Sequence, residues 1–136
     1  MQTLFDNAFE TVNFYEELSL FEAIWKPESA NMEDIDYQNE VNAQFAFIAT
    51  KKIKNILFDT CHFHFVIGVE TQEWNNEILI KNFLEAGVKK VAVVLSPDIF
   101  SQVSVQQTIK EYKNVSFQTN YFKSNEDAKA WLAKEK

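Results

Sequence analysis

The hydrophobic pattern over the first 26 residues predicts a β-hairpin. β-branched and aromatic side chains alternate with polar ones over residues 9–15 and again over 18–26, on either side of a short acidic break. The second segment carries apolar side chains on both faces, with Phe21, Ala23 and Trp25 on one and Leu18, Leu20 and Ile24 on the other. We therefore expect both faces of this strand to be at least partly covered, and Pro27 to end it.

Two helices are expected in the middle of the chain. The first is indicated by apolar residues at roughly helical spacing from Ile35 to Ile48, followed by lysines in the last turn. Asn31 can cap the start of this helix. Thr71 can cap the second, and Gly87 is expected to stop it.

Two more helices are expected in the last third of the chain. Ser96 followed by Pro97 indicates a helix start, since proline at the first position loses no needed hydrogen bond, and this helix is expected to reach about Glu111. Ser124 predicts the start of the final helix. Its buried side chains are expected to be Ala128, Trp131 and Leu132.

Short apolar or alternating runs between the helices predict strands. These runs are residues 55–59, 90–95 and 115–121. The order β-β-α-β-α-β-α-β-α favours an α/β fold with a mixed sheet, in which the later strands are parallel and the helices pack against the sheet. With 46% hydrophobic content, residues 1–136 are expected to form a single domain around one core.

Charge and glycine content argue against several common function classes. All 13 basic residues are lysines and 20 residues are acidic, so the net charge is -7 and the chain lacks the arginine fork that grips phosphate. Such a field repels a polyanion, and nucleic acid is not an expected partner. With only Gly68 and Gly87, the chain has neither a P-loop nor a dinucleotide-binding fingerprint.

The single cysteine and the lack of a long apolar run predict a cytoplasmic protein. Cys61 has no partner for an intrachain disulfide, which suits a reducing compartment. No stretch approaches the roughly 18 apolar residues needed to cross a bilayer, and the first residues lack the basic start of an export signal. We expect no integral membrane segment.

Several segments resemble one bacterial family. They are the hairpin ending in Trp25, IKNILFDT at 53–60, TQEW at 71–74, GVKKVAVVL at 87–95, PDIF at 97–100 and the closing residues 128–132. Over nearly the whole chain, this pattern resembles the SpoIIAA-like group of STAS/Sec14-type domains. The resemblance implies a small α/β domain related to anti-sigma-factor antagonists, which bind a partner kinase and are switched by serine phosphorylation, and to Sec14-type domains, which hold apolar ligands.

The chain departs from the antagonists at the start of the second helix. They carry an Asp-Ser pair there, whereas this chain has Val69, Glu70 and Thr71. Thr71 is the nearest hydroxyl by position, and Glu70 beside it would repel an added phosphate.

The default ligand site is the crevice at the carboxyl ends of the parallel strands. The sequence places Asp59, Thr60 and Ser96 there. Asp59 and Ser96 can contact a ligand, but the competing interpretation, that they cap the end of a strand and the start of a helix, is the one we favour.

Cys61, His62 and His64 are the only soft or imidazole ligands in the chain. They do not complete a zinc ligand set without carboxylates. As a nucleophile Cys61 would need a base within reach, and an extended segment turns the adjacent His62 to the opposite side. We therefore expect no catalytic residue, no metal site and no cofactor.

Aromatic side chains near these residues are the remaining candidates. Phe63 and Phe65 lie in a segment without periodicity, and they either fold back to close the core, which we favour, or cover a pocket or a partner surface. In the second helix one face gathers Leu79, Ile80, Phe83, Leu84 and Ala86. Trp74 and Ile78 fall on the polar side, where the loop or a second protomer would have to cover them.

Two function hypotheses follow. The first is a non-catalytic regulatory or protein-interaction module of STAS type, acting as a homodimer or with another protein partner. The alternative is a small apolar-ligand (lipid-like) binding domain, with a pocket at the carboxyl ends of the parallel strands lined by Phe63, Phe65 and Trp74. An enzyme ranks third.

Overall fold

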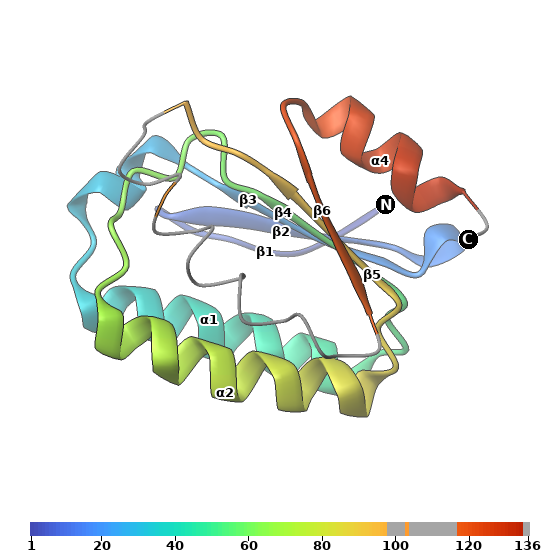
Figure 1. Ribbon diagram of the computed structural model, residues 1–136, viewed down its shortest axis with the longest axis horizontal. Coiled ribbons are helices and arrows are strands. Elements are labelled where there is room, and N and C mark those ends of the chain that lie inside the picture. Colours follow the sequence, from blue (N-terminus) through green and yellow to red (C-terminus); the bar gives the residue numbers. More distant parts are fainter. Residues whose placement is uncertain (98–102, 104–116, 135–136) are drawn as a thin grey trace.

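A six-stranded sheet with helices on both faces forms the molecule in the computed structural model, which describes residues 1–97, 103 and 117–134 (Figure 1). The strands are β1 (Gln2–Asp6), β2 (Glu10–Tyr15), β3 (Leu20–Trp25), β4 (Asn55–Asp59), β5 (Lys90–Val94) and β6 (Gln118–Phe122). They lie in sequence order, antiparallel from β1 to β3 and parallel from β3 to β6. The predicted α/β fold with a mixed sheet is confirmed.

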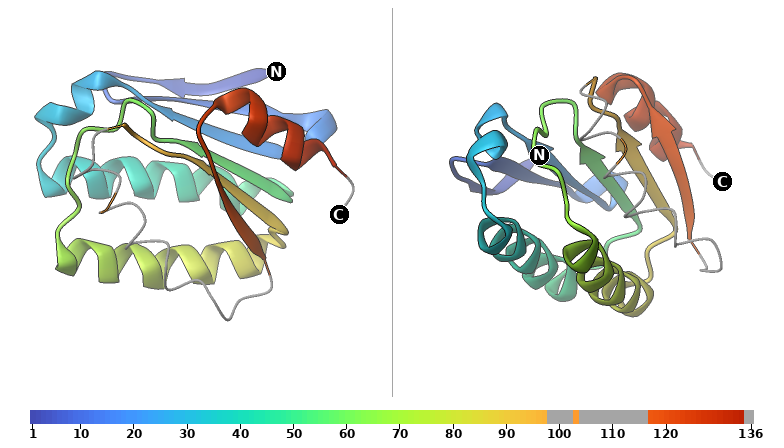
Figure 2. Two further views of the ribbon diagram at one scale, coloured as in Figure 1. Left: turned by 45° about the horizontal axis from the view of Figure 1, so that its top comes forward. Right: turned by 60° about the vertical axis from the view of Figure 1, so that its left-hand side comes forward.

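The helices divide between the two faces of the sheet. They are α1 (Asp34–Thr50), α2 (Val69–Ala86) and α4 (Asn125–Ala133), with short 3-10 turns η1 (Glu16–Leu18) and η2 (Pro27–Asn31). α1 and α2 run side by side across one face, and α4 lies on the other (Figures 1 and 2). None of these described helices has the length and apolar character to cross a bilayer. The helix predicted from Ser96 to Glu111 falls largely outside the described residues.

The first strand, β1, was not expected from the sequence. It is an edge strand of five residues, none of which is fully buried, and its register with β2 shifts between Thr3 and Phe5. An edge strand without a buried face has little hydrophobic alternation to reveal it. The element order therefore begins with three strands where two were predicted.

The predicted end of α2 and the predicted start of α4 are confirmed. Gly87 ends α2 with a φ of 80°, a left-handed conformation that glycine adopts without steric cost. The Ser124 hydroxyl accepts a hydrogen bond from the Asp127 backbone N–H at 3.2 Å and so caps α4. Of the side chains expected to be buried in α4, Ala128 and Leu132 are buried and Trp131 is partly exposed.

The two predicted caps of α1 and α2 are wrong. Asn31 lies in η2, and α1 is capped at Glu33, whose backbone N–H donates to the Asp36 carboxylate at 2.8 Å. The N-cap of α2 is Gly68, so Thr71 lies within the first turn of that helix and is buried. In both places the sequence offers more than one residue that can cap a helix, so residue type alone does not fix where the helix begins.

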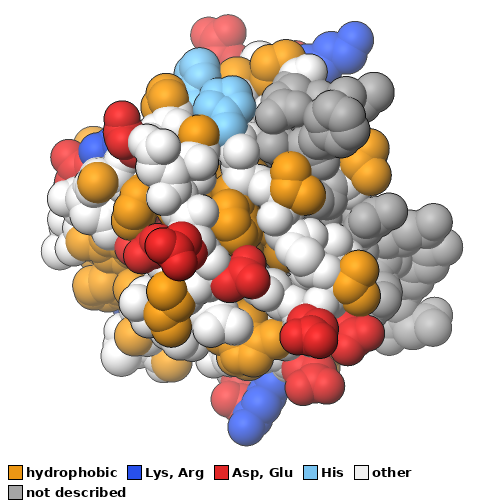
Figure 3. Space-filling model, turned by 90° about the vertical axis from the view of Figure 1, so that its left-hand side faces the viewer, with side chains coloured by type: hydrophobic (Ala, Val, Ile, Leu, Met, Phe, Trp, Pro, Cys, Tyr) orange, Lys and Arg blue, Asp and Glu red, His pale blue; other side chains and the backbone are white. Residues whose placement is uncertain are grey.

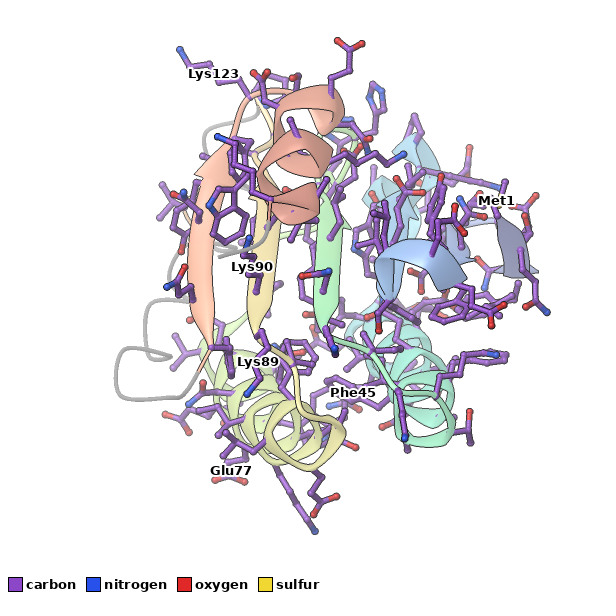
Figure 4. All side chains as sticks on the ribbon, turned by 90° about the vertical axis from the view of Figure 1, so that its right-hand side faces the viewer. Met1, Phe45, Glu77, Lys89, Lys90 and Lys123 are labelled. Atoms are coloured by element: carbon purple, nitrogen blue, oxygen red, sulfur yellow. The ribbon has the colours of Figure 1, made fainter. Side chains whose placement is uncertain are left out.

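Two apolar clusters lie on opposite faces of the sheet. The larger lies between the sheet and α1 and α2, and the smaller lies beneath α4. Figure 4 shows Lys90 on the α4 side and Phe45 on the side of the other two helices. The Lys90 ammonium donates to the carbonyls of Trp131 at 3.1 Å and Lys134 at 2.6 Å, and so neutralises the C-terminal end of α4.

The buried stripe of α2 differs from the expected apolar face. It consists of Thr71, Asn75, Leu79 and Phe83, each four residues after the last. Thr71 and Asn75 are polar, so a prediction from apolar residues alone puts the buried face of α2 in the wrong place. Trp74 and Ile78 flank it and pack against the larger cluster, so the chain itself covers them in part, whereas Leu84 is 48% exposed.

Candidate functional site

The carboxyl ends of the parallel strands and the N-terminal ends of α1 and α2 meet at one end of the molecule (Figures 1 and 2). In an α/β sheet this end is the usual place for a ligand. Figure 3 faces it and shows hydrophobic side chains next to acidic ones. The loop 60–68 crosses this end between β4 and α2.

A partly open cavity of about 50 Å³ lies beneath that loop, between the sheet and the two helices. It is lined by Trp25, Tyr37, Val41, Gln44, Phe45, Phe58, Thr60, Phe63, Ile67, Asn75 and Leu79. The volume is several times the roughly 10–15 Å³ that one water molecule requires. The cavity can therefore hold the head or body of a small molecule, but not a lipid chain.

Aromatic rings form one wall of the cavity. The ring centroids of Trp25 and Phe63 are 4.9 Å apart in an edge-to-face contact, and those of Trp25 and Tyr37 are 6.0 Å apart and stacked. Phe65 stacks on the ring of Tyr37, with ring centroids 5.5 Å apart, but does not line the cavity. Stacked and edge-to-face contacts of this kind stabilise the wall.

Polar side chains meet at the same cavity, and each is engaged in a hydrogen bond. The Tyr37 hydroxyl donates to the Asn75 amide oxygen at 3.2 Å, and the Gln44 amide nitrogen donates to a Glu10 oxygen at 2.8 Å. The Thr60 hydroxyl donates to the backbone carbonyl of Val94. A few oriented polar groups within an apolar wall are typical of small-molecule sites.

A pair of buried carboxyl groups lies next to the cavity. Glu10 is fully buried on β2, beside Trp25 in the register of β2 and β3, and Glu40 of α1 is also buried. Burial, and then the neighbouring Glu40 carboxyl, raise the pKa of Glu10 well above its usual range. Burial and the charge of Glu10 also raise the pKa of Tyr37, so that its hydroxyl stays neutral.

A second polar cluster lies on the α4 side of the sheet and is centred on Glu22 of β3. This buried carboxylate accepts hydrogen bonds from Asn13, Tyr15 and Asn125, and pairs with the Lys129 ammonium at 2.9 Å. Burial alone would raise the pKa of Glu22, but the hydrogen bonds and Lys129 outweigh burial and hold the pKa below its usual range.

Asp59 belongs to this second cluster and faces away from the cavity. One of its oxygens accepts the backbone N–H of Cys61 at 3.1 Å, and the other accepts the Asn125 amide at 2.9 Å. These bonds fit the structural role of closing the end of β4. Ser96 is buried after β5.

The structure brings only part of the predicted site together. Thr60 and Phe63 line the cavity, while Phe65, Trp74 and Ile78 pack against the larger apolar cluster without lining it. Phe63 and Ile67 are buried, so this part of the loop folds back onto the core as the favoured interpretation held. Thr71 is buried inside the first turn of α2.

Sequence reasoning missed the residues that give the cavity its polarity. Trp25 was expected only on one face of a strand, and Tyr37, Glu10 and Gln44 were not singled out. A usable signal was present: Glu10 and Glu22 each occupy one face of a strand whose neighbours on that face are apolar. A charged residue in such a position is either paired or functional.

Cys61, His62 and His64 do not gather into a metal site. Across the described part of the chain, no group of three or more histidine, cysteine, aspartate or glutamate side chains is placed to hold an ion. Cys61 is half-buried and packs at the edge of the cluster beneath α4.

Replacement of Cys61 by alanine is expected to change the free energy of unfolding by less than about 1 kcal/mol. The thiol contributes only a peripheral apolar contact, and the hydrogen bond to Asp59 comes from the backbone of residue 61. Urea unfolding checks the stability, and elemental analysis checks the zinc content. Stoichiometric zinc that is lost in the variant would contradict this prediction.

No family model, no curated protein and no solved structure matches the chain.

Proposed function

We propose that the protein is a non-catalytic binding module that holds a small molecule in the cavity beneath the loop 60–68. The observation that carries the proposal is the combination in that cavity of an aromatic wall with oriented polar side chains at the carboxyl ends of the parallel strands. The resemblance to STAS/Sec14-type domains supports a binding role, and the unpaired Cys61 is compatible with a reducing, cytoplasmic location.

A protein-interaction role is the second candidate, and exposed apolar side chains favour it. Ile35 at the start of α1, Val66 in the loop and Val69 at the start of α2 are each more than half exposed. All three lie within two residues of a side chain that lines the cavity. A partner protein or a second copy of the chain would use these groups.

Val41→Phe tests the first candidate, because the larger side chain fills the cavity. Fragments that bind the protein, detected by NMR through the Trp25 indole and Phe63 amide signals, are expected to bind the variant at least about tenfold more weakly. Val69→Phe, the same change at an exposed position, is the matched control and is expected to leave binding intact.

Two results would contradict small-molecule binding. Fragments that bind Val41→Phe as well as the parent protein do not occupy the cavity. Signal changes confined to Ile35, Val66 and Val69, together with a dimer mass in light scattering, would instead favour the protein-interaction role.

A further inference from the structure

Three of the polar side chains lining the cavity offer acceptors to a ligand. Gln44 uses its amide nitrogen to reach Glu10, which leaves its amide oxygen without a partner among the described residues. The hydroxyl groups of Tyr37 and Thr60 donate to Asn75 and Val94, so towards a ligand these hydroxyl oxygens can only accept hydrogen bonds. A ligand that meets these three groups must donate hydrogen bonds.

Among the described residues, no cation pairs with the buried carboxyl groups next to the cavity. One oxygen of Glu10 accepts from Gln44, and the other, Oε2, receives no hydrogen bond from a donor in the described part of the chain. Glu40 accepts from the Asn7 amide at 2.8 and 3.0 Å, and its carboxyl group also lies within hydrogen-bonding reach of Glu10. The ion pairs found among the described residues lie elsewhere, at Asp6 and Glu22. A buried carboxyl group is stabilised most by an opposite charge.

The aromatic wall suits a cation as well as an apolar group. The rings of Trp25, Tyr37 and Phe63 lie within about 6 Å of one another and all line the cavity, so an ammonium group there would lie close to several aromatic rings. The hydrocarbon body of the same ligand would pack against Val41 and Leu79.

The charge of the surrounding chain favours the approach of a cation. Residues 27–50, which form η2 and α1, contain five acidic side chains and no lysine. The partial positive charge at the N-terminus of α1 is already matched by its own first-turn acids, Asp34 and Asp36. With a net charge of -7, the molecule attracts cations over longer distances too.

From these observations we infer that the cavity binds a small organic cation, a primary amine on a short hydrocarbon body. The inference rests on the proposed binding function and names its ligand class. The amine donates to Gln44 Oε1 and to the oxygens of Tyr37 and Thr60, and its charge is balanced by the adjacent pair Glu10 and Glu40. The cavity volume limits the enclosed part to a few heavy atoms.

Three probes of equal length test the inference by NMR titration of the full chain at neutral pH. They are n-butylammonium, 1-butanol and butyrate. Butylammonium is expected to shift the Trp25 indole and Gln44 side-chain amide signals and to bind at least about tenfold more tightly than 1-butanol. Butyrate is expected not to bind, because it would face acceptors and buried carboxyl groups.

Variants assign the effect to the named groups. Glu10→Gln keeps the hydrogen bond to Gln44 but cannot ionise when the ammonium group binds, and Gln44→Leu removes the amide acceptor. Each is expected to weaken butylammonium binding about tenfold or more without weakening 1-butanol binding. Glu28→Gln, which removes an exposed charge near the same end, is the control and is expected to change affinity no more than about twofold.

The outcomes separate this inference from the proposed function. Equal binding of 1-butanol or butyrate at the same signals would overturn the amine assignment and leave small-molecule binding standing. Full butylammonium affinity in both Glu10→Gln and Gln44→Leu would overturn it as well. No response of the cavity signals to any of the three probes would overturn both proposals.

Discussion

Replacement of Glu22 by alanine is expected to lower the free energy of unfolding by about 4 kcal/mol. Glu22 is fully buried between the sheet and α4, so its removal leaves a cavity. It also removes the acceptor of several donors, which are Asn13, Tyr15, Asn125 and Lys129. Urea unfolding followed by circular dichroism measures the loss. Because Asn125 and Lys129 belong to α4, hydrogen exchange is expected to show α4 opening first.

Glu22→Gln separates the charge from the packing. The amide has the same shape but cannot pair with Lys129, and a loss of about 2 kcal/mol is expected at neutral pH. The pKa of Glu22 is lowered in the folded protein, so its stabilising effect is present above the ordinary glutamate pKa and is lost as the pH falls through the folded value. The difference between parent and variant should therefore shrink in acid. A difference that stays constant with pH would show that packing, not charge, accounts for it.

Elements with strong local signals could be predicted from the sequence. The strand Asn55–Asp59 is a continuous apolar run between polar residues, and it is found with the expected bounds. Gly87 is the only residue near the end of α2 that adopts a left-handed conformation at no cost, and Ser124 has its hydroxyl next to the first turn of α4. In each case the determining interaction lies within a few residues of the signal.

Features that depend on partners distant in the sequence could not be predicted. β1 is recognisable only through its pairing with β2, and the buried stripe of α2 includes Asn75, whose partner Tyr37 lies 38 residues earlier. The cavity is equally nonlocal, since its aromatic wall joins Trp25, Tyr37 and Phe63 from three separate segments. Hydrophobic periodicity reports which residues are buried and carries no information on which polar residues are buried with them.

Glu10 and Glu22 are buried on opposite faces of the same hairpin and have different hydrogen-bonding and charged partners. Glu22 faces α4 and meets an ammonium and three neutral donors. Glu10 faces α1 and meets a second carboxyl group with one amide donor. Opposite pKa shifts follow, downward for Glu22 and upward for Glu10. The same substitution, glutamate to glutamine, should therefore have opposite effects on stability at the two positions.

Glu10→Gln is expected to stabilise the protein by on the order of 2 kcal/mol in mildly alkaline solution. The glutamine oxygen can still accept the Gln44 amide, and its nitrogen can donate to Glu40, so no hydrogen bond is lost and the cost of burying an ionisable carboxyl group is removed. In the parent, the raised pKa means that the folded chain keeps a proton that the unfolded chain releases. Stability then falls by up to about 1.4 kcal/mol per pH unit as the pH rises from the ordinary glutamate pKa toward the folded value.

The pH dependence makes this prediction specific to the Glu10 proton. Urea unfolding of parent and variant across the acid-to-alkaline range should give similar stabilities in acid, where Glu10 is protonated in both states, and a growing advantage of Glu10→Gln as the pH rises. Loss of stability in the variant at every pH would mean that Glu10 is charged and stabilised in the folded protein. Saturating butylammonium should reduce the advantage of the variant, because the amine supplies the parent's buried carboxyl pair with a positive charge that no described residue provides.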